Sequence, residues 1–390
     1  MPNLVRHLDN RISSHFSKYK EILLLLGPRQ SGKTTLLKRI FPIAAYLLVD
    51  NEPVRKALES YDLNTYKQLF PATKQLIIDE IHLLTNPGRA AKIIYDQAPE
   101  INLIITGSSS LNIKNKAAES LAGRFIEYQL LPLTFSEYLT QLGLEKSLNF
   151  RLFEQLIEGP SNKKMYLFDV NQALQNAVIY GLYPRLIDQP RNTEYLTNLA
   201  NTLAFKDIDE LSLIEKRRDA VNLLKLLAFQ IGKLINYSEL ASKLGLNQET
   251  VKRYLEIFEQ SFIIYRLYPY FQNKRREISK SPKVYFYDTG LRNAIINNLS
   301  PLDLRPDAGQ LFENFLVNEA TKANSYNNSG YALNYWRTKQ GSEVDLILSA
   351  ANNLLGIEIK LGTEKAAGLT ALVNHYPKAK TRIVTSENFY

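Results

Sequence analysis

The sequence predicts an α/β fold with a parallel sheet near its start, and three observations lead to this prediction. An apolar run of strand length, Ile22–Leu26, leads directly into a glycine-rich loop that ends in Lys33. A second apolar run lies within 74–80 and ends in two carboxylates, and a third, within 101–110, ends in small hydroxyl residues. Continuous apolar runs bounded by turn residues are typical of parallel strands buried on both faces.

Composition limits the class of protein. The chain has 390 residues, which favours two or three domains, and its 45% hydrophobic and 22% charged residues are ordinary for a globular protein. It has no cysteine, which excludes disulfides, thiolate metal sites and cysteine nucleophiles. The N-terminal residues lack the apolar core of a secretory signal, and no apolar run is long enough to span a bilayer. We therefore expect a cytoplasmic protein that does not use a membrane.

The charge balance favours acidic partners. The formal net charge is +9 and the pI is about 9.3. Such a balance points to nucleic acid first, with DNA as the expected partner. A generally basic cytosolic protein without such a partner is the alternative.

The loop after the first predicted strand fits the phosphate-binding pattern G-x-x-x-x-G-K-[ST] in full. Its backbone N–H groups and the following helix N-terminus would surround phosphate oxygens, so we expect a nucleotide site. Lys33 would reach the β- and γ-phosphates, and the Thr34 hydroxyl would hold Mg²⁺. A chance glycine turn is disfavoured, because strand, loop and helix agree. The predicted phosphate-binding residues are Gly27, Pro28, Arg29, Gln30, Ser31, Gly32, Lys33, Thr34 and Thr35.

The second and third strands supply candidate catalytic groups, because ligands of parallel sheets bind at the carboxyl ends of the strands. Asp79 would orient Mg²⁺ and its water shell, and Glu80 is placed to polarise a water for attack on the γ-phosphate. Ser108 is the candidate polar sensor of that water, although a serine-rich turn would give the same letters.

Arg124 follows a predicted helix and directly precedes a predicted strand that begins at Phe125. In ring-forming ATPases an arginine at this point reaches the γ-phosphate bound by a neighbouring subunit, where its planar charge suits the transition state. This predicts a homo-oligomer, with a ring as the expected form. A solvated or salt-bridged arginine is the alternative.

Together these segments resemble the AAA-type ATPases of bacteria and archaea that carry a C-terminal domain of unknown function. The resemblance rests on the order of five segments: Gly27–Thr35, Ile77–His82, Thr106–Ser110, Leu121–Arg124 and Leu131–Tyr138. It covers essentially the whole chain and implies an AAA-type core over roughly 19–140, with ATP and Mg²⁺ as cofactors. It also implies the roles given above for Lys33, Thr34, Asp79, Glu80, Ser108 and Arg124.

The middle of the chain predicts a helical lid or linker over 141–218 and a winged helix over 219–300. Asn247 and Ser238 are candidate helix caps. Outward-facing residues of the helix that Asn247 would cap, together with a basic wing, would contact DNA phosphates. A winged helix used only for packing between protein segments is the alternative. The predicted DNA contacts are Gln248, Lys252, Arg253, Lys274, Arg275 and Arg276.

The last part of the chain, 301–390, looks like a PD-(D/E)xK nuclease fold. An acid on a helix, Glu313, is followed by Asp345 and then by Glu358 and Lys360 on the next strand. Residues i and i+2 of a strand point to one face, so Glu358 and Lys360 would converge with Asp345. The carboxylates would hold Mg²⁺, and Lys360 would steady the attacking water or the phosphate. A nuclease-like scaffold that only binds or packs is the alternative.

The predicted architecture is therefore an α/β chain with an AAA-type P-loop core over 1–140, followed by a helical lid, a winged helix and a nuclease-like α/β domain. The leading functional hypothesis is a Mg²⁺-dependent, oligomeric ATPase that couples hydrolysis to binding or remodelling of DNA, including branched DNA. Two alternatives remain open: a regulatory NTPase switch that acts on protein partners, and a metal-dependent nuclease gated by ATP.

Overall fold

The computed structural model describes residues 4–71, 73–108, 121–159, 169–203, 217–271, 281–351, 353–362 and 367–390. The chain forms two compact units. Unit 1 comprises Met1–Pro132 with Gln260–Phe262, and unit 2 comprises Leu133–Glu259 with Ile263–Tyr390. Across the described ranges, no helix combines the length and the apolar character needed to cross a bilayer.

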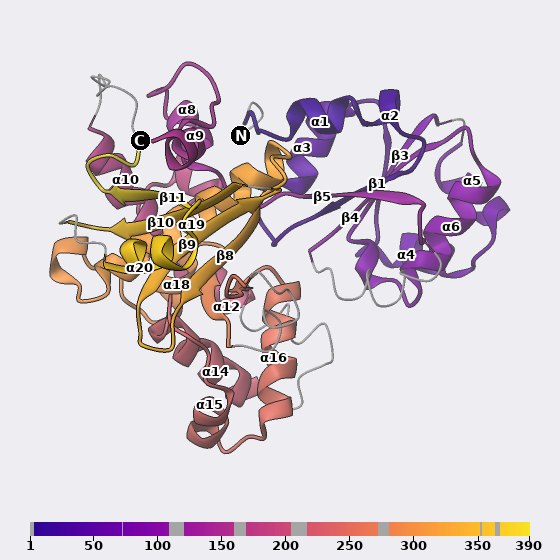
Figure 1. Cartoon of the computed structure of the whole chain (residues 1–390). Helices are drawn as coiled ribbons and strands as arrows, with labels where there is room; N and C mark the ends of the chain where they lie inside the picture. Colours follow the sequence, from indigo (N-terminus) through magenta and orange to yellow (C-terminus); the bar gives the residue numbers. More distant parts are fainter. Residues whose placement is uncertain are drawn as a thin grey trace. The chain divides into compact units, whose positions relative to one another are not determined.

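Unit 1 contains a five-stranded sheet in the order β2-β3-β4-β1-β5, in which every neighbouring pair is parallel (Figure 1). This confirms the parallel α/β sheet predicted from the apolar runs. All side chains of β1 are buried, as continuous apolar sequence requires. The strands are β1 Ile22–Leu26, β2 Ala45–Leu48, β3 Gln75–Asp79, β4 Asn102–Gly107 and β5 Phe125–Gln129. The helices are α1 Asp9–Ser13, α2 His15–Lys18, α3 Lys33–Ile40, α4 Glu52–Glu59, α5 Leu63–Leu69, η1 Ile81–Leu83 and α6 Pro87–Gln97.

The parallel register places three functional segments at one edge of this sheet. Because β1, β3 and β4 run in the same direction, their carboxyl ends lie together. The loop after Leu26, the carboxylates after Ile78 and the residues after Gly107 all start at that edge. The sheet therefore positions the candidate nucleotide site.

Unit 2 begins with helices. Thr134 caps α8 through a capping box, in which its hydroxyl accepts from the Glu137 N–H while the Glu137 carboxylate accepts from the Thr134 N–H. The helices before the central region are α8 Phe135–Gln141, α9 Arg151–Glu158, α10 Val170–Tyr180, α11 Arg185–Asp188 and α12 Thr193–Asn201.

The described residues up to Phe286 of the region predicted as a winged helix form three helices and an antiparallel pair of strands. These are α14 Arg217–Phe229, α15 Tyr237–Leu244, α16 Gln248–Gln260, β6 Ile264–Leu267 and β7 Lys283–Phe286. Asn247 accepts from the Thr250 N–H at 2.7 Å and so caps α16, as the sequence predicts. The cap predicted at Ser238 is wrong: Asn236 caps α15, and the Ser238 hydroxyl accepts from Gln248 instead. An asparagine two residues earlier offers a better-placed side-chain oxygen for the first turn.

The C-terminal part forms a four-stranded sheet in the order β11-β10-β9-β8. The helices α19 and α20 pack against it (Figure 1). Trp336 and Val344 of the sheet and Leu372 of α20 belong to one buried cluster. The remaining elements are α18 Thr289–Ile295, η3 Leu302–Leu304, α19 Ala308–Tyr326, β8 Ala332–Arg337, β9 Glu343–Ala350, β10 Asn353–Lys360, α20 Ala367–His375 and β11 Lys380–Thr385.

A buried ion pair on α19 holds the start of unit 2. Lys322 donates to the carbonyl of Leu133 at 2.7 Å and to Glu319 at 2.9 Å. The other carboxylate oxygen of Glu319 accepts from the Phe135 N–H at 2.8 Å. Both charged side chains are buried. The Leu-Thr-Phe segment recognised in the sequence is thus tied to a helix that lies far along the chain.

Candidate nucleotide site

The loop Gly27–Gly32 is shaped by two glycines with positive φ. Gly27 has φ +155°, and a Cβ added there would lie 2.1 Å from the carbonyl oxygen of Leu130. Gly32 has φ +95° and directly precedes α3. A side chain at Gly27 would collide with backbone, and Gly32 adopts a conformation that only glycine takes without strain. The glycine spacing in the sequence is therefore a steric requirement of this turn.

Arg6 supports the loop from behind, and sequence reasoning missed it. Its guanidinium donates to the carbonyl of Ser31 at 2.9 Å and to the carbonyl of Leu131 at 2.7 Å. The side chain is 2% exposed. The guanidinium of Arg6 is buried and permanently charged. Because it contacts both the loop and the segment after β5, it fixes the spacing between them. A lone arginine near the start of a chain gives no sequence signal for this role.

Lys33 lies at the first turn of α3 and is buried. Its Nζ donates to the carbonyl oxygens of Gly27 at 2.8 Å and Pro28 at 3.0 Å, so the ammonium lies against the loop. Phosphate oxygens would offer the same ammonium charged acceptors, which form hydrogen bonds roughly twice as strong as neutral ones.

Thr34 and Asp79 meet at the edge of the sheet. The Thr34 hydroxyl donates to Oδ2 of Asp79 at 2.6 Å, and the Tyr46 hydroxyl donates to the same oxygen at 2.6 Å. The Thr106 hydroxyl donates to Oδ1. Burial alone would raise the pKa of Asp79, but the hydrogen bonds from Thr106, Thr34 and Tyr46 outweigh it and hold the pKa below its usual value. The carboxylate is thus kept ionised and oriented.

These oxygens fit a magnesium ion. A hydroxyl and a carboxylate that converge beside a phosphate loop are the hard oxygen donors that Mg²⁺ prefers, with water and phosphate as its other ligands. Tyr46 and Thr106, which orient Asp79 from β2 and β4, were not predicted. The only sequence signal for Thr106 is a polar residue near the end of an apolar strand, and Tyr46, the second residue of β2, had no such signal.

Glu80 follows β3 with φ +58°, an uncommon conformation for a residue with a side chain. Burial raises its pKa, and the positive charges of Lys33 and Arg29 oppose that rise. Its Oε2 is buried and has no hydrogen-bond partner among the described residues. A buried carboxylate oxygen with spare accepting capacity, beside the loop, is what a group that orients water needs.

His82 connects Glu80 with Ser108. Its Nδ1 lies 3.2 Å from Oε2 of Glu80, without hydrogen-bond geometry, and its Nε2 lies 3.4 Å from the Ser108 hydroxyl. Burial lowers the pKa of His82 to about 4, so the imidazole is neutral at neutral pH. Sequence reasoning placed Ser108 near the attacking water but gave no role to His82. The spacing Asp-Glu-x-His was the available signal.

Arg124 lies at the other end of the sheet. Its carbonyl accepts from the N–H of Ile22, where β1 begins, whereas the phosphate loop starts where β1 ends. Its guanidinium lies 3.2 Å from Asp96 of α6 and is about one-third exposed. Arg124 is therefore separated from the phosphate loop by the length of β1.

The predicted DNA contacts on α16 lie on its exposed side. Gln248 and Arg253 are exposed, and Lys252 pairs with Glu249 at 2.8 Å. The predicted wing contacts Lys274, Arg275 and Arg276 lie outside the described residues.

The four residues predicted as a nuclease-like site do come together in unit 2. Nζ of Lys360 lies 2.8 Å from Oε1 of Glu358 and 3.8 Å from Oδ2 of Asp345. Glu313 joins them through Lys283 of β7, which sequence reasoning missed: its Nζ lies 3.1 Å from Glu313 and 3.8 Å from Asp345. Among the described residues, no three His, Asp or Glu side chains are arranged to hold a metal ion.

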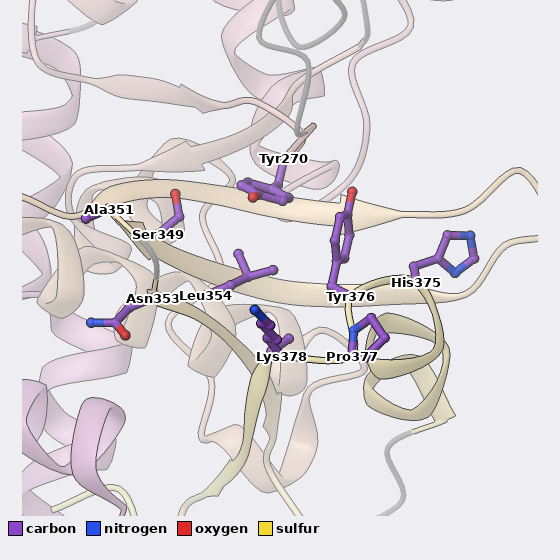
Figure 2. A pocket seen from close by; sticks show the side chains of 10 residues that line it. Tyr270, Ser349, Ala351, Asn353, Leu354, His375, Tyr376, Pro377 and Lys378 are labelled. Carbon is purple, nitrogen blue, oxygen red and sulfur yellow. The ribbon is translucent and has the colours of Figure 1, made fainter.

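A pocket of about 460 Å³ lies elsewhere in unit 2. Figure 2 shows the side chains of Tyr270, Tyr376 and Leu354 around it, with Lys378 beside them. The two tyrosine rings meet edge to face at 5.6 Å. Its described lining includes none of the residues predicted from the sequence, and it holds no pair of carboxylates.

Three segments of the chain match family models. Residues 19–139 match a model described as an AAA domain. Residues 171–302 and 308–390 match two models described as domains of unknown function, DUF8612 and DUF4143. The first match contains the phosphate loop, Asp79, Glu80 and Arg124.

Individual proteins and solved structures resemble this chain at low sequence identity. An uncharacterised protein of Methanocaldococcus jannaschii is 26% identical over 397 residues, which cover 94% of this chain and 81% of that protein. An uncharacterised protein of Mycobacterium tuberculosis is 25% identical over 344 residues, 87% of this chain and 70% of that protein. A Walker-type ATPase of Pyrococcus abyssi aligns over 75% of this chain and 96% of its own, at 14% identity and a TM-score of 0.47.

Proposed function

We propose that this chain, an AAA-type P-loop ATPase with a C-terminal domain of unknown function, works as a Mg²⁺-dependent oligomer. It would couple ATP hydrolysis to binding or remodelling of DNA. The observation that carries the catalytic part is the meeting of Thr34, Asp79 and Glu80 beside one phosphate loop. The oligomer and the DNA role each rest on separate observations given below.

In the proposed reaction, the loop and Lys33 bind the phosphates, and Lys33 exchanges its loop carbonyls for phosphate oxygens. Thr34 and Asp79 would hold Mg²⁺, which neutralises charge that develops on the phosphates. Glu80 orients a water through its unpartnered oxygen and takes up its proton. Neutral His82 lies between Glu80 and Ser108 and contacts the loop after β4 through the Ser108 hydroxyl.

The position of Arg124 favours an oligomer. Its own phosphate loop lies at the opposite end of β1, so Arg124 does not reach the γ-phosphate of its own subunit. Arg124 is about one-third exposed there and pairs with Asp96, which it would have to leave to reach a nucleotide held by a neighbouring copy, where such a finger is worth about 10³- to 10⁵-fold in turnover.

A mixing experiment tests the trans role. Arg124→Ala and Glu80→Gln are each expected to be almost inactive as single species. A mixture of the two should regain turnover, because an interface between an Arg124→Ala subunit that keeps Glu80 and a Glu80→Gln subunit that keeps Arg124 is intact. Steady-state phosphate release, measured against the mixing ratio, gives the answer. If the mixture stays as inactive as its components, or if Arg124→Ala alone retains full turnover, Arg124 is not a finger.

The DNA role rests on charge. The formal net charge is +9, and α16 presents Gln248, Lys252 and Arg253 on its exposed side. Acidic side chains share this surface, since Glu249 pairs with Lys252. Such a surface would bind phosphates without reading sequence.

ATP turnover is expected to rise with DNA, and binding should weaken steeply as salt increases. Duplex, single-stranded, forked and four-way-junction DNAs are compared in one assay. The slope of the logarithm of the DNA-binding constant against the logarithm of the salt concentration counts phosphate contacts. Replacing Lys252 and Arg253 by alanine should reduce the magnitude of this salt slope by about two, because each phosphate contact contributes about one. Lys225→Ala, an exposed lysine of α14, is the matched control and should leave the slope unchanged. No stimulation and no retardation at low salt would favour the regulatory switch that acts on protein partners.

A further inference from the structure

The nuclease-like cluster of unit 2 contains a lysine that the sequence pattern does not include. Lys283 lies on β7, outside the segment that supplies the predicted acids. Its side chain is 2% exposed, and its Nζ lies 2.6 Å from Oε1 of Glu343, 3.1 Å from Glu313 and 3.8 Å from Asp345. The ammonium therefore sits among three carboxylates that come from a helix and a strand.

Each of these three carboxylates also contacts a donor other than Lys283. Oε1 of Glu313 accepts from Lys283 at 3.1 Å and from the Tyr285 hydroxyl at 2.5 Å. Oδ2 of Asp345 accepts from the N–H of Ile359 at 2.8 Å. Oε2 of Glu343 lies 3.3 Å from Arg337.

The charges of the cluster nearly balance without a metal. Glu313, Glu343, Asp345 and Glu358 face the cations Lys283, Lys360 and Arg337. Burial lowers the pKa of Lys283, but the negative charges of Glu313, Asp345 and Glu343 outweigh this and raise it overall, so the ammonium stays charged. Adding a divalent cation beside a buried ammonium would be strongly repulsive.

We propose that the Lys283 ammonium occupies the place that a divalent cation would take among Glu313, Glu343 and Asp345. Unit 2 then binds no Mg²⁺ at this cluster and cleaves no phosphodiester bond there. The carboxylate oxygens of Glu313 and Asp345 lie 3.1 Å and 3.8 Å from Nζ of Lys283. A Mg²⁺ ion in that place would require oxygens at about 2.0–2.1 Å. Lys283 is the group by which this cluster departs from the metal site that the pattern Asp, Glu-x-Lys predicts.

The test uses the full-length chain without nucleotide and Mn²⁺ as the probe, in calorimetric titration and thermal unfolding. We expect wild type and Asp345→Asn to bind the same amount of Mn²⁺, because wild type has no Mn²⁺ site that includes Asp345. Lys283→Ala removes the internal cation and should raise Mn²⁺ affinity by about a hundredfold or more, because a unit positive charge within 4 Å is lost. This gain should vanish in Lys283→Ala with Asp345→Asn.

Two controls make the result specific. Lys283→Arg keeps a cation in place and should gain no Mn²⁺ binding. Lys360→Ala removes the cation paired with Glu358, while Lys283 stays, and should gain far less than Lys283→Ala. The proposal is overturned if wild type binds Mn²⁺ through Asp345, or if folded Lys283→Ala shows no gain. Should Lys283→Ala fail to fold, the comparison of wild type with Asp345→Asn still decides.

Discussion

Replacing Glu80 by glutamine is expected to lower ATP turnover by about 10²- to 10⁴-fold while leaving ATP binding nearly unchanged. Glutamine keeps the size of the side chain but cannot take a proton from water. The groups that hold phosphates, in the loop and on Lys33, are untouched by this change. Single-turnover phosphate release and equilibrium binding of a fluorescent ATP analogue separate the two effects.

Glu100→Gln is the matched control for this change. Glu100 is an exposed glutamate of unit 1, so the same substitution there should alter neither turnover nor binding. If Glu80→Gln hydrolyses ATP at the wild-type rate, Glu80 does not activate the water, and the buried oxygen beside His82 would have only a structural role.

The substitution Lys322→Met is expected to lower the free energy of unfolding of unit 2 by about 3–5 kcal/mol, because it leaves a buried carboxylate without its partner. Glu319 is buried together with Lys322 and accepts the backbone N–H of Phe135, so it cannot turn to water without breaking that contact. Lys322 also holds the carbonyl of Leu133, which would lose its donor. Urea unfolding followed by fluorescence of Trp336, the sole tryptophan, reports on unit 2.

Two further variants separate the charge effect from general loss of packing. Lys322→Met combined with Glu319→Gln should recover part of the stability, because the amide still accepts from Phe135 and carries no buried charge. Lys243→Met breaks an exposed pair with Glu239 on α15 and should cost less than about 1 kcal/mol. Equal losses for Lys322→Met and the double variant would show that the unpaired charge is not the cause.

Much of unit 1 was predictable because its signals are local. The apolar run at β1 gave the strand with its bounds, and the glycine spacing predicted a turn that sterics then required at Gly27. Asp79 and Glu80 could be placed at the carboxyl edge because parallel strands share one direction. The loop and its two acids therefore follow from chain pattern and elementary geometry.

The partners of these residues could not be predicted, because they come from segments that are distant in the chain. Arg6 reaches the loop from the segment before α1, and Tyr46 and Thr106 orient Asp79 from neighbouring strands. Nothing in a lone arginine or tyrosine marks such contacts. The wrong cap at Ser238 has a local cause, because Asn236, two residues earlier, takes the capping role.

Local patterns in the chain were enough to place the candidate nucleotide site, because periodicity, glycine spacing and residue chemistry act over a few neighbouring residues. They also gave the acids of the C-terminal cluster and their shared face. Folding brings Lys283 of β7 among these carboxylates, and we propose that its charge takes the place of the expected metal. The physical reason is that burial makes each charge depend on its spatial neighbours, which the order of residues does not specify.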